Sequence, residues 1–209
     1  MNSPITLWVG KDLVSVFAMS AFVALHEKRL PFDLEVVDLK AGEQRSELYR
    51  QLSMTCKVPT LVHEGFALSE SSAIAEYLDE VFPAPDHPAL FPTDLRDRAR
   101  ARQLQAWLRS DLQPLRSERP ADLFYAPAPV APLGDAASAA AQKLLEVADR
   151  LIGHDKHLFS QWCIADTDLA VILYRLIANG DPVPEKLRRY VERQLARASV
   201  RLWMDQVRA

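Results

Sequence analysis

The sequence predicts two domains of different class, a small α/β domain followed by an all-α domain. Strand and helix patterns alternate up to residue 81, whereas no convincing strand pattern follows residue 94. The stretch between them is rich in proline (Pro83, Pro85, Pro88 and Pro92), and no helix could cross it. We therefore expect domains at residues 1–81 and 94–209, joined by a linker at residues 82–93.

Composition excludes several classes of protein. The chain of 209 residues is 49% hydrophobic and 25% charged, with a net charge of −3, which is ordinary for a soluble globular protein and gives no reason to expect nucleic acid as a partner. The first apolar run is too short for a signal peptide, and no stretch approaches the ~20 residues of a membrane span. Cys56 and Cys163 are far apart and form no CxxC pair, so we expect a reducing cytoplasm.

The first domain begins with a strand-helix-strand pattern. Residues 5–9 (ITLWV) form a short apolar run typical of a buried strand, and residues 15–29 follow a helical pattern that is apolar on nearly all sides. Pro31 ends this helix, and residues 32–37 alternate like a second strand. The pattern predicts a right-handed parallel β-α-β unit. Residues 42–52 are polar and predict a short exposed helix at best.

Residues 57–79 read KVPTLVHEGFALSESSAIAEYLD and predict a hairpin followed by a helix. Pro59 cannot donate to a strand ladder, so a strand begins there, and Glu64-Gly65 interrupts the apolar run as a turn would. The hydroxyls and carboxylate of Ser69 to Ser72 then precede a helical pattern. A helix begins with unpaired backbone amides, and such an end binds anions, carboxylates included.

The sequence of the second domain predicts helices and no strands. Apolar residues recur every three and four positions in each segment, and the segment after Asp166 is apolar almost throughout, which predicts a central helix. The expected helices cover residues 94–116, 136–152, 166–178 and 184–196, with a short last one at 200–207. Residues 120–133 contain four prolines and predict a loop.

The order of a Val-Pro step, a hairpin and SESSAIAEYL resembles the glutathione-binding half of the glutathione S-transferase family. The resemblance covers the whole chain and implies a thioredoxin-like βαβ-α-ββα first domain and a helical-bundle second domain. Within the family, ALSESSAIAEYL, RARARQLQAWLRSDL and CIADTDLA resemble the bacterial YfcF-type members. Cys163 stands where most members have the hydroxyl of a capping box with Asp166, so the reciprocal half of this box is uncertain.

The resemblance assigns glutathione-binding residues. Glu70 would meet the γ-glutamyl ammonium and Ser71 its carboxylate, because an α-amino acid end needs an anion beside a donor cluster. The alternative is plain helix capping by Ser69 or Glu70. A cis peptide bond before Pro59 would turn the backbone of Val58 toward the cysteinyl part of glutathione.

Two positions beside this Val-Pro step carry weaker assignments. Lys57 would either reach the glycine carboxylate of glutathione or simply be solvated. Cys56, in a run that departs from the family's usual Asn-Pro-x-Gly, is interpreted as structural.

The resemblance also implies a catalytic tyrosine, serine or cysteine at the start of the first helix. Tyr49 and Cys56 are the first tyrosine and cysteine of the chain, so only Ser15 fits this position. It would donate a hydrogen bond to the glutathione sulfur and favour the thiolate. The alternative is that Ser15 only caps the helix.

Other groups carry weaker hypotheses. An arginine-rich face with Arg98, Arg102 and Arg109 predicts a solvated or dimer-facing surface. The alternative is that one or two of these arginines, with Trp107, face a cleft between the domains where an anionic ligand would lie. The apolar co-substrate would lie near Trp107 and the Val9–Ser15 loop. His154 and His157 have a helix-compatible metal spacing without a third ligand, and we expect no metal.

The expected protein is a homodimeric glutathione transferase with glutathione as co-substrate and a small hydrophobic electrophile or peroxide as partner. Its expected role is in detoxification and oxidative stress. Two alternatives stay open: a glutathione-dependent isomerase or dehalogenase on the same fold, and a non-catalytic binding module.

Overall fold

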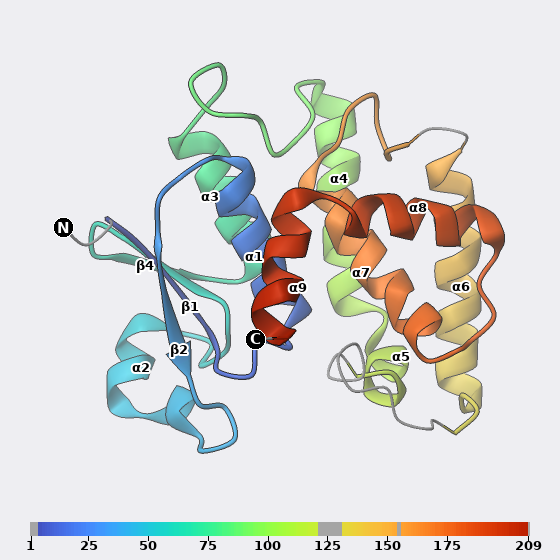
Figure 1. Ribbon diagram of the computed structural model, residues 1–209, viewed down its shortest axis with the longest axis horizontal. Helices are drawn as coiled ribbons and strands as arrows, with labels where there is room; N and C mark the ends of the chain where they lie inside the picture. The colour runs from blue at the N-terminus through green and yellow to red at the C-terminus, as the bar shows by residue number, and fades with distance from the viewer. Residues whose placement is uncertain (1–3, 121–130, 154–155, 209) are drawn as a thin grey trace. The chain divides into compact units, whose positions relative to one another are not determined.

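The computed structural model describes residues 4–120, 131–153 and 156–208 (Figure 1). The chain divides into two compact units, residues 1–90 with 202–209, and residues 91–201. The first unit holds a four-stranded mixed sheet with helices, and the described part of the second holds helices without a strand. The predicted fold class is confirmed. Among the described helices, none is both long and apolar enough to cross a membrane.

The sheet of the first unit has the strand order β2-β1-β3-β4. β1 runs parallel to β2, and β3 runs antiparallel to both β1 and β4, so the predicted β-α-β unit and hairpin are both present. Glu64 and Gly65 join β3 to β4 with positive φ angles of 50° and 84°, as a tight hairpin of primed type requires. The elements are β1 (Ile5–Gly10), α1 (Val16–Glu27), β2 (Asp33–Val37), β3 (Thr60–His63) and β4 (Phe66–Ser69).

The two faces of the sheet are covered differently. Ile5, Leu7 and Val9 alternate along β1 and are buried on the face where α1 and α3 (Ser71–Val81) pack side by side (Figure 1). Trp8 points to the opposite face and meets the ring of Tyr49 edge-on, with 6.0 Å between ring centroids. Tyr49 lies on the short helix α2 (Glu47–Leu52), which follows the 3₁₀ helix Glu43–Arg45.

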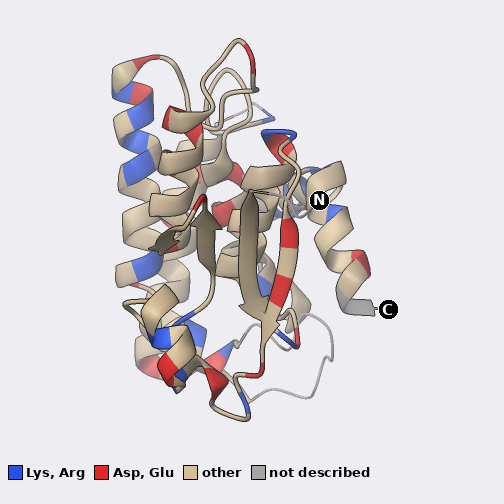
Figure 2. Ribbon diagram, turned by 90° about the vertical axis from the view of Figure 1, so that its left-hand side faces the viewer, with Lys and Arg blue, Asp and Glu red and all other residues tan. Residues whose placement is uncertain are grey.

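The edge strand β2 carries acidic side chains. Its sequence, DLEVV, holds the acidic residues Asp33 and Glu35, and Figure 2 shows the acidic positions of the first unit in red. An edge strand leaves backbone donors and acceptors free to pair with another chain, and charge along it opposes that pairing. Asp33 and Glu35 therefore protect the sheet from edge-to-edge association.

A buried ion pair joins the ends of α1 and α3. Lys28 is 0% exposed, and its Nζ lies 2.7 Å from Oδ1 of Asp79 and donates to the carbonyl of Phe82 at 2.8 Å. The same Asp79 oxygen accepts the amide of Leu90 at 2.7 Å. The pair thus holds the proline-rich segment after α3 against the end of α1. The sequence pattern did not predict it, because Lys28 stands among charges that suggest an exposed helix end.

The last helix, α9 (Ala198–Arg208), contributes its second half to the first unit. The indole of Trp203 is fully buried. Its ring makes an edge contact with the ring of Phe22 of α1, with 5.2 Å between the ring centroids. The short helix expected at residues 200–207 is therefore longer and belongs partly to the first core.

The second unit is arranged around one buried helix, as predicted. All residues from Ile164 to Leu173 are buried. The expected helix at 94–116 is instead two helices, because Pro114 cannot continue an α-helix and begins a new one. The helices are α4 (Leu95–Ser110), α5 (Gln113–Glu118), α6 (Asp135–Ile152), α7 (Ile164–Ala178) and α8 (Glu185–Leu195).

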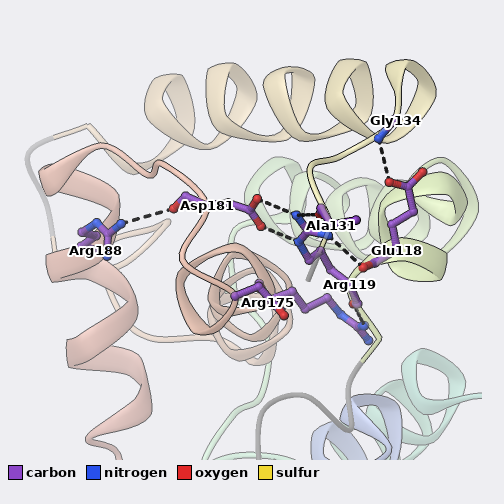
Figure 3. Close-up of polar contacts among 8 residues, drawn as sticks. Glu118, Arg119, Ala131, Gly134, Arg175, Asp181 and Arg188 are labelled. Carbon is purple, nitrogen blue, oxygen red and sulfur yellow. Dashed lines mark hydrogen bonds and ion pairs between the residues drawn. The ribbon is translucent and has the colours of Figure 1, made fainter. Parts of the chain in front are cut away.

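A buried arginine ties α5 to the end of α7 (Figure 3). Nε and Nη2 of Arg119 donate to the two carboxylate oxygens of Asp181 at 2.6 and 2.8 Å, and Nη2 also donates to the carbonyl of Ala131 at 3.1 Å. The carboxylate raises the pKa of Arg119 above its ordinary value. Residues 121–130 of the loop expected at 120–133 lie outside the described residues.

The capping box at the start of α7 forms with Cys163 in the hydroxyl position. Asp166 accepts the Cys163 amide at 2.9 Å, and both halves of the box are present. Asp166 also accepts the Leu158 amide at 2.8 Å and the Tyr190 hydroxyl at 2.9 Å, so one carboxylate orders three segments. Burial raises the pKa of Asp166, and it raises the pKa values of Cys163 and Tyr190 well above their ordinary values. The doubt about the reciprocal half is resolved in favour of a complete box.

Candidate functional site

The register of the sheet brings the predicted site residues to one end of the first unit. Thr60, the first residue of β3, pairs with Trp8 near the end of β1 and with Ser69 at the end of β4. The loop from β1 to Ser15, the Val58-Pro59 step before β3 and the Glu70-Ser71 step after β4 therefore leave the sheet at the same end. The N-termini of α1 and α3 lie there too, and helix N-termini favour negative charge.

The peptide bond between Val58 and Pro59 is cis, as the sequence resemblance implies. Pro59 is buried, Val58 is half-buried and Lys57 is exposed. Val58 thus keeps part of its surface accessible, and Lys57 is open to solvent. Cys56 is half-buried with a φ of 51°, and its thiol is free.

Glu70 occupies the N-cap position of α3 in an unusual conformation. Its φ of 73° is rare for a residue with a side chain, and such strain collects at functional sites. The Glu70 side chain is exposed and makes no capping hydrogen bond, whereas the Ser69 hydroxyl lies 2.9 Å from that of Ser53. Plain capping therefore does not explain these residues. Ser71 follows as the first helical residue, 2% exposed.

Ser15 is the N-cap of α1. Its backbone is extended, with φ −72° and ψ 111°, and its Oγ accepts the amide of Ala18 at 3.2 Å. Capping uses a lone pair of the hydroxyl, so the hydroxyl hydrogen is left to donate elsewhere. The two predicted roles of Ser15, helix cap and hydrogen-bond donor, are thus compatible in one conformation.

The sequence prediction missed a cluster of hydroxyls beneath the Val-Pro step, and we call Tyr49, Ser53, Thr60 and Ser69 the hydroxyl cluster. All four residues are buried, and the hydroxyls of Tyr49, Ser53 and Thr60 lie 3.1, 3.2 and 3.2 Å from the carbonyl oxygen of Lys57. The polar stretch before Lys57 suggested exposure, and nothing in its spacing marks these side chains as buried partners.

Part of the arginine-rich face of α4 contacts other residues of the second unit. Figure 2 shows the closely spaced basic residues along this helix. Gln105 donates to Asp168 of α7 at 2.7 Å, and Arg109 pairs with the same carboxylate at 3.2 Å. Arg98 lies over the ring of Phe91, 5.2 Å from its centroid. These contacts give the face a structural role that neither sequence hypothesis included.

Trp107 lines a groove between α4 and α6. Its indole Nε1 donates to Asp111 at 2.6 Å, and Lys143 lies 5.9 Å from the ring centroid. The groove measures about 430 Å³, with Leu104 and Val147 on its apolar walls. It lies wholly within the second unit, and the position of a co-substrate near Trp107 stays a prediction.

A metal site has no support among the described residues. No group of three or more His, Cys, Asp or Glu side chains there could hold an ion. His157 lies near the amide of Gln194, at 3.3 Å, and His154 lies outside the described residues.

Comparisons with known proteins cover both units. The family model of the glutathione S-transferase N-terminal domain matches residues 14–81, and that of the C-terminal domain matches residues 94–207. Curated relatives include rat glutathione S-transferase theta-1, 34% identical over 49% of this chain, and human theta-2, 36% identical over 46%. These alignments span 42% and 38% of the two relatives, less than half their length.

Solved structures are similar over nearly the whole chain. A glutathione transferase homolog from Burkholderia, crystallised with bound glutathione, is 55% identical with a TM-score of 0.83, covering 98% of both chains. Glutathione transferase F2 from Populus trichocarpa is 20% identical with a TM-score of 0.79 and covers 98% of this chain, and it supports the fold alone. From both domain matches and the 55% identical structure, the chain belongs to the glutathione S-transferase family.

Proposed function

We propose that the protein is a glutathione transferase that activates glutathione as a thiolate, for conjugation to a hydrophobic electrophile or for reduction of a peroxide. One observation carries the proposal. The cis Val58-Pro59 step before β3 and the strained Glu70 after β4 lie at the same end of the sheet as Ser15. The solved Burkholderia homolog with bound glutathione supports the choice of ligand.

Glutathione would bind as an extended chain along this end of the sheet. The Val58 backbone would pair with the cysteinyl unit like an added strand, with cis Pro59 fixing its direction. At the γ-glutamyl end, the Glu70 carboxylate would meet the ammonium, and the Ser71 hydroxyl with the first amides of α3 would meet the carboxylate. Lys57 is exposed and would meet the glycine carboxylate.

Ser15 would stabilise the glutathione thiolate. Lowering a thiol pKa by two units requires ~2.7 kcal/mol. A hydrogen bond to a charged group supplies about 1.5–3 kcal/mol, and the N-terminus of α1 adds roughly 0.3–1 kcal/mol. The Ser15 hydroxyl hydrogen is not used in capping. The required ~2.7 kcal/mol lies within the combined range of these two contributions, so the proposal needs no general base.

The test is a titration of bound glutathione, followed by the ultraviolet absorbance of its thiolate. Ser15→Ala should return the thiol pKa toward that of free glutathione and lower turnover with a generic electrophile. Ser46→Ala is the matched control, because Ser46 caps α2 in the same way by accepting the Tyr49 amide at 3.3 Å. An unchanged thiol pKa in Ser15→Ala would remove Ser15 from the mechanism.

Two alternatives are separated by substrate range. A glutathione-dependent isomerase or dehalogenase would form its own products from candidate substrates, and a non-catalytic module would bind immobilised glutathione without turnover. We favour the transferase, because Ser15, Glu70 and Ser71 lie at the same end of the sheet, where Glu70 and Ser71 would hold the γ-glutamyl end of glutathione and Ser15 would stabilise its thiolate. A screen of electrophiles and hydroperoxides on protein retained by immobilised glutathione decides among the three.

We further propose a homodimer in a reducing cytoplasm, acting in detoxification or oxidative stress. The family resemblance supports the dimer, and the two free thiols, Cys56 and Cys163, suit a reducing compartment. Light scattering coupled to size exclusion should give twice the 23.5 kDa chain mass. A monomer at micromolar concentration would contradict this part of the proposal.

A further inference from the structure

The hydroxyl cluster surrounds a single backbone oxygen. Tyr49, Ser53 and Thr60 each place a hydroxyl within 3.2 Å of the Lys57 carbonyl. The hydroxyls also contact one another: that of Tyr49 lies 3.0 Å from that of Thr60, and that of Ser53 lies 2.9 Å from that of Ser69. Each hydroxyl has one proton and a carbonyl has two lone pairs, so the hydroxyls share their protons in a connected network around this oxygen.

Holding the Lys57 carbonyl fixes a whole peptide plane. The Lys57–Val58 bond is not among the cis bonds of the described chain, and a trans peptide is planar with its C=O and N–H pointing in opposite directions. Since the carbonyl points into the buried cluster, the Val58 N–H points away from it. The cluster therefore sets the direction of the donor expected to bind the cysteinyl unit of glutathione.

The network also reaches the other half of the site. Ser69 is the last residue of β4 and comes immediately before Glu70. Its hydroxyl contacts Ser53 at 2.9 Å and Thr60 at 3.4 Å. The segment carrying Val58 and the segment carrying Glu70 are thus joined by buried hydroxyl contacts in addition to the backbone hydrogen bonds between β3 and β4. Burial also raises the pKa of Tyr49, which keeps its hydroxyl protonated.

We propose that Tyr49, Ser53, Thr60 and Ser69 are positioning residues for glutathione, acting through the Lys57–Val58 peptide and the Ser69–Glu70 step. This inference rests on the proposed glutathione site and adds residues that touch no ligand themselves. It assigns them a functional role beyond satisfying buried hydroxyls. They orient the Val58 amide, and they hold the Val58 segment and the Glu70 segment at the spacing that the two parts of glutathione require.

The test compares hydroxyl-deleting variants with variants that keep the hydroxyl. Tyr49→Phe retains the ring that meets Trp8, and Thr60→Val retains the shape of the side chain. Each should weaken glutathione binding in calorimetry by roughly 3- to 10-fold, the effect of one hydrogen bond. The KM for glutathione should rise by the same factor while kcat at saturating glutathione stays within about 2-fold, because the lost interaction serves binding.

Two control variants test whether the loss of a cluster hydroxyl is the cause of weaker binding. Thr60→Ser keeps the hydroxyl and should bind glutathione like the wild type. Tyr77→Phe removes a tyrosine hydroxyl from the same unit, bonded to His63 at 2.8 Å and outside the cluster, and should leave the KM unchanged. Thermal unfolding of each variant separates loss of fold from loss of orientation.

The outcomes are distinct. If the wild type does not bind glutathione, the proposed function fails, and the positioning role fails with it. If the wild type binds but Tyr49→Phe and Thr60→Val bind within 2-fold of it, the positioning role alone is wrong. An equal loss in Thr60→Ser or Tyr77→Phe would likewise overturn it, since the cluster hydroxyls would then not be the cause.

Discussion

Replacing Lys28 with methionine should destabilise the protein strongly, although Lys28 lies outside the proposed site. Its ammonium is fully buried, 2.7 Å from Asp79, so Lys28→Met leaves a buried carboxylate without its cation. Breaking such a pair from one side costs about 3–5 kcal/mol. For a chain of this length, that loss lowers the unfolding temperature by roughly 6–20 °C.

A double-mutant cycle isolates the pair. Asp79→Asn should cost as much as Lys28→Met, because it leaves the buried ammonium without a counter-charge, while the amide oxygen can still accept the Leu90 amide. The double variant buries no charge and should cost much less than the sum of the two. Urea unfolding followed by circular dichroism and by tryptophan fluorescence measures all four proteins.

The exposed pair of Lys11 and Asp38 is the control. These groups lie 3.3 Å apart with side chains 67% and 28% exposed, so Lys11→Met should leave the urea midpoint nearly unchanged. If the Lys28 and Asp79 variants were additive to within about 0.5 kcal/mol, the pair would contribute nothing beyond its separate side chains, and the reasoning from burial would be refuted.

Three further predictions concern the second unit. Asp94 caps α4 by accepting two amides at 2.9 and 3.0 Å, so Asp94→Ala should cost about 1 kcal/mol in urea unfolding and Asp94→Ser much less. Arg119→Lys loses one arm of the bidentate contact with Asp181 and should cost about 1.5–3 kcal/mol; an unchanged midpoint would contradict this. Burial raises the folded-state pKa of Cys163, so the unfolded chain releases that proton first, and stability should fall as pH rises past about 8.5. Comparing urea midpoints at neutral and alkaline pH should show a smaller fall in Cys163→Ser than in the wild type.

The sequence pattern was sufficient for the fold because its strongest signals are local. The apolar run before Gly10, the proline at 59 and the turn at Glu64-Gly65 each determine an element without reference to distant residues. The family resemblance added the cis bond before Pro59, which propensity alone would not favour. The break at Pro114 was also local, but the regular spacing of leucines around it favoured one long helix.

What the pattern could not supply is the partner of a buried polar group. Lys28, Tyr49 and Arg119 are ordinary polar residues in sequence, and each becomes informative only when a distant segment supplies its partner: Asp79, the Lys57 carbonyl or Asp181. The two members of each pair are far apart in the sequence and follow no helical or strand period, so the spacing of residues does not predict them. The orientation of the Val58 amide depends on one of these groups.

The burial of Trp203 against Phe22 also has a consequence for biosynthesis. A ribosome completes residues 1–90 long before it adds Trp203, because the whole of residues 91–201 must be translated in between. During that interval the nascent first unit lacks the indole that covers Phe22, and its apolar surface stays open to chaperones. Folding of the first unit is therefore expected to finish only after residues 91–201 have been translated.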